Sequence, residues 1–316
     1  MDYGPFRSFL YSNWIACDHS KNLNLDVSDM KVFFYDFQNN FSASFKSDNA
    51  VEQISSLHNL DVTRKLIFYV PGYRSHIKKY SPEIMRQTFR DVPNVYLVII
   101  DHSAYTLLES KWKSYENSVM YTYNMGQAVG KVLADFRNKG LPSENIHCVG
   151  HSLGSQILGV AGVNYFNRTR ERVWRITGID PAGPCFSNSF IEEQLRSGCA
   201  DYVEVYHCSA GSLGTTSVLA DIDFFFNEAG KIQPHCHVGI IPGLGESDAA
   251  KCSHKACVAY WAKTVRKPGW YLATRCESYE KYERGECAGN EVAIAGYSNP
   301  GNTSGVFYVS TDAYDV

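Results

Sequence analysis

A short apolar run, I-H-C-V-G at residues 146–150, leads into H-S-L-G and then into an apolar pattern of helical period. This predicts a strand that turns sharply into a helix, with Ser152 at the turn between Gly150 and Gly154. Such a turn needs small residues so that strand and helix can approach, and it projects the serine hydroxyl from the top of a sheet. The N–H of Leu153 can then point toward a developing oxyanion. We interpret Ser152 as a candidate nucleophile; an ordinary glycine-containing strand–helix turn is the alternative.

Strand-like runs recur along the chain with helical patterns between them. The strand-like runs are residues 31–37, 65–72, 95–101, 146–150, 175–180 and 202–207, and the helical patterns are 81–90, 118–137 and 153–166. Several of these strands are continuously apolar, as expected of strands that are covered on both faces. Ser81 and Pro82 suit the N-cap and the first helical position of the 81–90 helix. The alternation predicts an α/β fold with a mostly parallel central sheet and helices on both faces.

The length of 316 residues suits one large α/β domain. We expect a single domain over residues 1–316, with its core from about residue 30 to about residue 290 and a short Gly-, Asn- and Ser-rich tail after 290. No apolar run reaches the roughly 18 residues that a membrane-spanning helix needs. The net charge of −3 argues against nucleic-acid binding.

The number of cysteines indicates the cellular compartment in which the protein folds. Ten cysteines, most of them in the C-terminal half, favour an oxidising environment. Sequons at Asn40, Asn167 and Asn302 are compatible with N-glycosylation. We therefore expect a secreted glycoprotein, although the N-terminal residues show no convincing signal peptide.

A serine hydroxyl becomes a good nucleophile when a base removes its proton and an acid orients that base. In a fold with this kind of turn, the acid and then a histidine follow the serine along the chain. Asp180 ends the strand at 175–180 just before P-A-G-P, on the same rim of the sheet as Ser152, with Asp201, Asp221 and Asp223 as competitors. The histidines that follow are His207, His235, His237 and His254. His254, in K-C-S-H-K-A-C before a helical stretch, is favoured, but chain order alone leaves the choice open.

Three motifs in order, G-H-S-L-G, G-I-D-P-A-G-P and C-S-H, resemble those of the pancreatic lipase family over roughly residues 30–290. Y-V-E-V-Y-H and A-D-I-D-F-F-F-N are similar to segments of the insect lipases and phospholipases A1. The resemblance implies an α/β-hydrolase fold and a lipid carboxylester hydrolase with Ser152 as nucleophile, Asp180 as acid and His254 as base. It also implies an oxyanion loop at V-P-G-Y (70–73), where the N–H of Tyr73 joins that of Leu153.

The chain departs from the family pattern at four positions. Pro71 stands where the family usually has His, His102 where it has Trp, Ala256 where it has Arg, and Cys257 where it has a small residue. Larger members carry a C-terminal β-sandwich that this chain is too short to hold, so we expect neither that domain nor a colipase-like partner. An inactive lipid-binding or storage homologue on the same fold is the alternative function.

Residues 236–252 form the second informative segment. We expect Cys236 and Cys252 to close a loop of about 15 residues. The tip of this loop is apolar and contains Val238, Ile240, Ile241 and Leu244. In the family this segment is a lid over the active site, which meets lipid at a membrane or emulsion surface. Its shortness resembles the phospholipase A1 members.

The remaining cysteines allow further expectations. We expect Cys276 to pair with Cys287 and Cys185 with Cys199, and we expect Cys148 to be a buried free thiol. The alternative for this region is a zinc site, built from His235, Cys236, His237, Cys252, His254 and Cys257. Disulfides explain these cysteines better, so we expect no metal and no organic cofactor.

Overall fold

The structure is a computed structural model that describes residue 17 and residues 24–107, 113–187, 191–236 and 245–312. Its strands are β1 Lys31–Asp36, β2 Phe41–Lys46, β3 Lys65–Val70, β4 Val95–Asp101, β5 Ile146–His151, β6 Arg175–Ile179, β7 Tyr202–His207, β8 Ile222–Phe226, β9 Tyr271–Arg275, β10 Val292–Ala295 and β11 Gly305–Val309. Its α-helices are α2 Ala50–Leu57, α3 Tyr80–Phe89, α4 Ser103–Thr106, α5 Lys113–Asn138, α6 Leu153–Thr169, α7 Gly245–Arg266 and α8 Tyr279–Glu283. Short 3₁₀ helices are η2 Ser143–Asn145, η3 Ile191–Glu193, η4 Glu228–Gly230 and η5 Pro234–Cys236.

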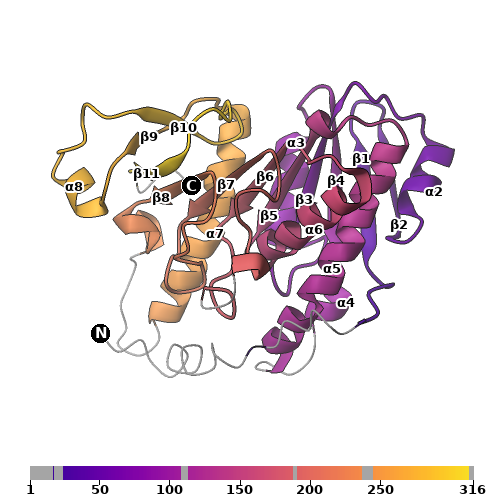
Figure 1. The fold of residues 1–316 in the computed structure, drawn as a ribbon, viewed down its shortest axis with the longest axis horizontal. Helices are drawn as coiled ribbons and strands as arrows, with labels where there is room; N and C mark the ends of the chain where they lie inside the picture. Colours follow the sequence, from indigo (N-terminus) through magenta and orange to yellow (C-terminus); the bar gives the residue numbers. More distant parts are fainter. Residues whose placement is uncertain (1–16, 18–23, 108–112, 188–190, 237–244, 313–316) are drawn as a thin grey trace.

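These strands form one sheet in the order β10-β9-β11-β8-β7-β6-β5-β3-β4-β1-β2 (Figure 1). The central strands, from β4 through β5 to β11, are parallel. The pairs at the two edges are antiparallel. The predicted mostly parallel sheet is therefore confirmed. Because parallel strands share one direction, the residues that follow β5, β6 and β7 lie along a single rim of the sheet.

Helices cover both faces of the sheet, as predicted. Leu66, Phe68 and Val70 of β3 belong to one apolar cluster, whereas Ile67 and Tyr69 belong to another. Successive side chains of a strand point to opposite faces, so both faces of β3 are buried. Helices α5 and α6 pack together in the first cluster, and α3 and α7 pack together in the second.

The starts of two helices differ from those predicted. Helix α3 begins at Tyr80, and the extended backbone of Lys79 supplies its N-cap position, so Ser81 lies within the helix instead of capping it. Pro82 still lies in the first turn, where its missing N–H leaves no helical hydrogen bond unmade. Helix α5 begins at Lys113, earlier than the predicted start at residue 118.

The segment after residue 290 is not a tail. Strand β10 pairs with β9, and β11 adds to β8 in parallel. Phe307 and Val309 of β11 are buried in the apolar cluster on the α7 face. The core therefore extends beyond 290. Within the described ranges, no helix combines the length and apolarity that crossing a membrane requires.

Candidate active site

Ser152 lies at the sharp turn between β5 and α6. Its backbone angles, φ 56° and ψ −123°, are ones that L-residues rarely adopt. A Cβ atom at Gly150 would come 2.6 Å from the Cα of Ser155, and one at Gly154 would come 2.1 Å from the carbonyl oxygen of Val70. Close packing therefore requires both glycines. Ser152 lies at the rim of the sheet and is 8% exposed.

Asp180 follows β6 on the same rim and is completely buried. Its Oδ1 accepts hydrogen bonds from the backbone N–H groups of Cys208 at 2.8 Å and Ser209 at 3.0 Å. Its Oδ2 accepts from the hydroxyl of Ser209. Burial raises the pKa of Asp180, but the hydrogen bonds from His254, Cys208 and Ser209 outweigh burial and hold this pKa below its usual value. Asp180 is thus a buried carboxylate that stays ionised.

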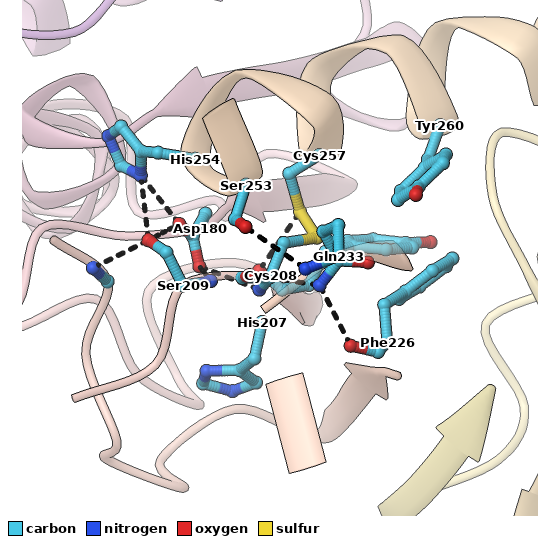
Figure 2. The surroundings of a disulfide bond; sticks show 12 residues. Asp180, His207, Cys208, Ser209, Phe226, Gln233, Ser253, His254, Cys257 and Tyr260 are labelled. Carbon is cyan, nitrogen blue, oxygen red and sulfur yellow. Dashed lines mark hydrogen bonds and ion pairs between the residues drawn. A yellow bond between two sulfur atoms is a disulfide. The ribbon is translucent and has the colours of Figure 1, made fainter. Parts of the chain in front are cut away.

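His254 contacts the second carboxylate oxygen of Asp180. Its Nδ1 donates to Oδ2 of Asp180 at 2.5 Å (Figure 2), and its side chain is 12% exposed. With the proton on Nδ1, the unprotonated Nε2 can accept a proton from another group. The sequence predicts His254 just before a helix, whereas in the structure His254 lies within α7. Helix α7 begins earlier than the sequence predicts, at Gly245.

Three of the competing residues, Asp221, Asp223 and His207, have other partners. Asp223 bonds His207 at 2.8 Å in a separate buried pair, and His207 stacks on Phe225. Asp221 accepts the N–H of Val203 at 2.8 Å. His207 is therefore a packing residue at the end of its strand, and Asp180 is the carboxylate that His254 contacts.

The predicted oxyanion loop lies against Ser152. A Cβ atom at Gly72 would come 2.9 Å from the Cβ of Ser152, so the backbone of the loop touches the nucleophile. The carbonyl oxygen of Pro71 accepts a hydrogen bond from Nε2 of His102 at 2.8 Å. Tyr73 packs edge-on against Tyr115, with ring centroids 5.1 Å apart. The sequence does not predict this hydrogen bond between Pro71 and His102, because it shows the two residues only as separate departures from the family pattern.

His151 directly precedes the nucleophile in sequence and contacts His254. Its Nε2 donates to the carbonyl oxygen of His254 at 3.1 Å, and the two imidazole rings are 4.5 Å apart. Burial, followed by the charge of the neighbouring His254, lowers the pKa of His151 to about 3. His151 is therefore a neutral packing residue that contacts the backbone of the base.

A family model described as Lipase matches residues 11–304. The chain belongs to the lipase family. Lipase member H-A of Xenopus laevis is 29% identical over 263 residues, which are 82% of this chain and 53% of that protein. Lipase member H of Oryctolagus cuniculus is 32% identical over 235 residues, 72% of this chain and 48% of that protein. Pancreatic lipase-related protein 2 of Bos taurus is 29% identical over 246 residues, 72% of this chain and 50% of that protein.

The chain thus spans about half the length of the curated relatives that it matches. Among solved structures, esterase PE8 superposes with a TM-score of 0.31 at 18% identity, covering 46% of this chain and 68% of its own. The α/β-hydrolase fold is assigned from the sheet order, the strand–serine–helix turn and the lipase family. The resemblance to the pancreatic lipase family is confirmed, and the insect branch stays a prediction.

The disulfides agree only partly with the prediction. Cys236 pairs with Cys252, and Cys276 pairs with Cys287, as predicted. Cys148 is a buried free thiol, also as predicted. The pairing of Cys185 with Cys199 is wrong. Cys185 bonds Cys17, 168 residues away in sequence, whereas Cys199 is buried against α6, where its carbonyl oxygen would lie 2.1 Å from a Cβ at Gly162. The last disulfide joins Cys208 to Cys257.

These pairings also bear on the zinc alternative. His235, Cys236 and Cys252 place their ligand atoms within 4.8 Å of one another. The two sulfurs are bonded to each other, however, and the sulfur of Cys257 is bonded to Cys208. Zinc binds thiolates and not disulfides, so this arrangement removes the sulfur ligands of the alternative. His254 is engaged with Asp180, and His237 lies outside the described residues.

The tip of the predicted lid, Val238, Ile240, Ile241 and Leu244, also lies outside the described residues. The structure describes the two ends of this segment, which are η5 and the start of α7. The Cys236–Cys252 disulfide joins them, with a Cα–Cα distance of 5.7 Å. The lid itself stays a prediction.

Proposed function

We propose that this chain hydrolyses lipid carboxylic esters with Ser152 as nucleophile, His254 as general base and Asp180 as the acid that orients the base. One observation carries the proposal: the 2.5 Å hydrogen bond from Nδ1 of His254 to a buried, ionised Asp180, on the same sheet rim as a strained serine turn. This bond fixes the tautomer whose Nε2 can take the proton of Ser152.

The reaction would proceed in two halves. Nε2 of His254 takes the proton of Ser152 Oγ as Oγ bonds the ester carbonyl carbon, and the negative charge of Asp180 stabilises the imidazolium that forms. The N–H groups of Leu153 and Tyr73 donate to the oxyanion. His254 then protonates the departing alcohol. In the second half, His254 takes a proton from water, the resulting hydroxyl attacks the acyl group, and fatty acid leaves as Ser152 regains its proton.

The substrate class follows from the family and from the lid prediction. We expect an acylglycerol or an sn-1 phospholipid ester at a membrane or emulsion surface. The short segment between Cys236 and Cys252 favours the phospholipid, because a short lid leaves room for a polar head group. The four disulfides support secretion, because such bonds persist in oxidising compartments.

The test uses purified protein and the matched variant Ser152→Ala. Both are incubated with a triacylglycerol emulsion and, separately, with vesicles of phosphatidylcholine labelled at sn-1 or at sn-2. Release of the sn-1 label by the wild type, and not by Ser152→Ala, supports a phospholipase A1. Release from triacylglycerol supports a neutral lipase. A folded wild type that releases nothing from either substrate would contradict the proposal and favour the lipid-binding alternative.

A further inference from the structure

The proposed acid and base come from different parts of the fold. Asp180 follows β6, and the two backbone N–H groups that bind its Oδ1 belong to Cys208 and Ser209, which follow β7. His254 belongs to α7, which packs on one face of the sheet. The Asp180–His254 bond therefore depends on how α7 is held relative to the segment after β7.

A covalent bond joins these two elements at the site. Cys208, whose N–H binds Asp180, forms a disulfide with Cys257, and both residues are almost completely buried. Cys257 lies three residues after His254 in α7, so the two side chains project from the same side of the helix. Figure 2 shows this disulfide beside the hydrogen bonds of Asp180. The crosslink thus connects a hydrogen-bond donor of the acid to the helix that carries the base.

Gln233 supplies a second connection. It is completely buried, and its Nε2 donates to the carbonyl oxygen of Cys208 at 2.9 Å and to that of Phe226 at 3.0 Å. Its backbone N–H donates to Oγ of Ser253, the residue before His254, at 3.0 Å. Its Oε1 accepts from Nδ2 of Asn227 at 2.7 Å. Gln233 therefore holds the residue before the base to the residue that binds the acid (Figure 2).

We infer that the Cys208–Cys257 disulfide and Gln233 together form a clamp that positions His254 against Asp180. The inference rests on the proposed function, because it assigns these residues to the reaction of Ser152. None of the three touches the reacting atoms, so they are positioning residues and not catalytic ones. A displacement of a catalytic group by about 1 Å can cost about a hundredfold in rate, which is why such a connection matters.

The main experiment compares two double variants that each remove one disulfide. Cys208→Ala/Cys257→Ala removes the clamp, whereas Cys276→Ala/Cys287→Ala removes a disulfide from a separate apolar cluster with Tyr308. We expect the first to lower kcat by between about tenfold and about a hundredfold with little change in KM. We also expect the acid limb of its pH profile of kcat/KM to move to lower pH. The reason is that a weaker contact between Asp180 and His254 stabilises the His254 imidazolium less. The control should keep kcat and the pH profile.

A direct readout of the hydrogen bond separates the clamp from the proposed reaction. The Nδ1 proton of His254 should give a low-field proton NMR resonance, assigned by its loss in Asp180→Asn. We expect this signal to disappear in Cys208→Ala/Cys257→Ala and to persist in Cys276→Ala/Cys287→Ala, whether or not the wild type hydrolyses lipid. An inactive wild type with this pattern would refute the proposed function and support the clamp. If the signal and kcat both persist in the first variant, the clamp is refuted.

Gln233→Met provides a second test in case the first variant does not fold. It keeps the disulfide and the approximate side-chain volume, and it removes the side-chain hydrogen bonds to Cys208, Phe226 and Asn227. We expect the same direction of change in kcat, in the acid limb and in the His254 resonance. A folded Gln233→Met protein that matches the wild type in all three would overturn the inference that Gln233 and the disulfide act together as a clamp.

Discussion

The neutral state of His151 should make the stability of this protein depend on pH in a predictable way. The residue is 7% exposed, and its Nε2 donates to the carbonyl oxygen of His254. Burial, followed by the charge of His254, lowers the pKa of His151 to about 3, from an ordinary value of 6.5. Because the folded pKa is lower, the unfolded chain takes up a proton first as the pH falls. The contribution of His151 to stability is therefore complete above about pH 6.5 and is lost progressively between about pH 6.5 and about pH 3.

The size of the effect follows from these two pKa values. A pH of about 5 lies about 1.5 units below the pKa of the unfolded imidazole, which is therefore mostly protonated, whereas folded His151 is still neutral. Each unit corresponds to about 1.36 kcal/mol, so folding loses about 2 kcal/mol through this one group. At about pH 7.5 this loss is close to zero, because His151 is then mostly neutral in both the folded and the unfolded chain. A loss of this size is a substantial part of the stability of a typical protein.

The assay is urea unfolding of the wild type and of His151→Gln at about pH 7.5 and about pH 5, with the disulfides intact. Glutamine keeps a donor for the carbonyl of His254 and does not titrate. Any constant cost of the substitution cancels when the two pH values are compared within each protein. His102 and His147 are also buried with lowered pKa values, and they are present in both proteins. We expect the wild type to lose about 2 kcal/mol more than the variant. Equal losses would show that His151 is not the buried neutral group described here.

Three further predictions concern the residues around the nucleophile. Asp180→Asn should fold normally and lower kcat about 10⁴-fold, measured on the ester that the wild type hydrolyses, because an amide cannot hold the tautomer of His254. His102→Phe removes the donor to the carbonyl of Pro71 and should lower kcat by about tenfold or more with KM retained, and an unchanged kcat would show that this bond does not position the oxyanion loop. Gly154→Ala would place its Cβ 2.1 Å from the carbonyl oxygen of Val70, so we expect destabilisation by about 3 kcal/mol or more in thermal unfolding. Gly289→Ala, with no neighbour within 4 Å, should be close to neutral.

Local patterns were enough to predict the serine turn and the strands β1, β3, β4, β5, β6 and β7, but not β8, which also lies in the parallel part of the sheet. The strand before Ser152 is a short, mostly apolar run, and the two glycines are required by close packing at the turn. The strands at and near the two ends of the sheet were harder to predict. Strand β2 alternates exposed and partly buried residues, and β10 and β11 are short and separated by Gly-, Asn- and Ser-rich chain. Such strands form because an existing sheet edge offers hydrogen bonds, which is a tertiary and not a local cause.

The pairing of distant residues was the other difficulty. The partnership of Asp180 with His254 was named only through the family resemblance, since chain order left several acids and histidines open. Two of the disulfides escaped prediction for the same reason. Cys17 bonds Cys185 across 168 residues, and Cys208 bonds Cys257 across 49. Pairing at such separations follows from how the strands and helices are placed, and sequence spacing carries no information about it.

The departures from the family pattern gain a different meaning when they are read as contacts. Taken singly, Pro71, His102 and Cys257 each suggest a weakened site. In the structure, the carbonyl of Pro71 is the acceptor of His102, and Cys257 is bonded to Cys208. Each contact reaches a part of the proposed machinery, the oxyanion loop in one case and the donors of the acid in the other. A substitution that removes a contact weakens a site, whereas a substitution that comes with its own partner can keep the geometry by another route. The relevant comparison with relatives is therefore between pairs of residues that touch, and on that comparison these departures support an intact site.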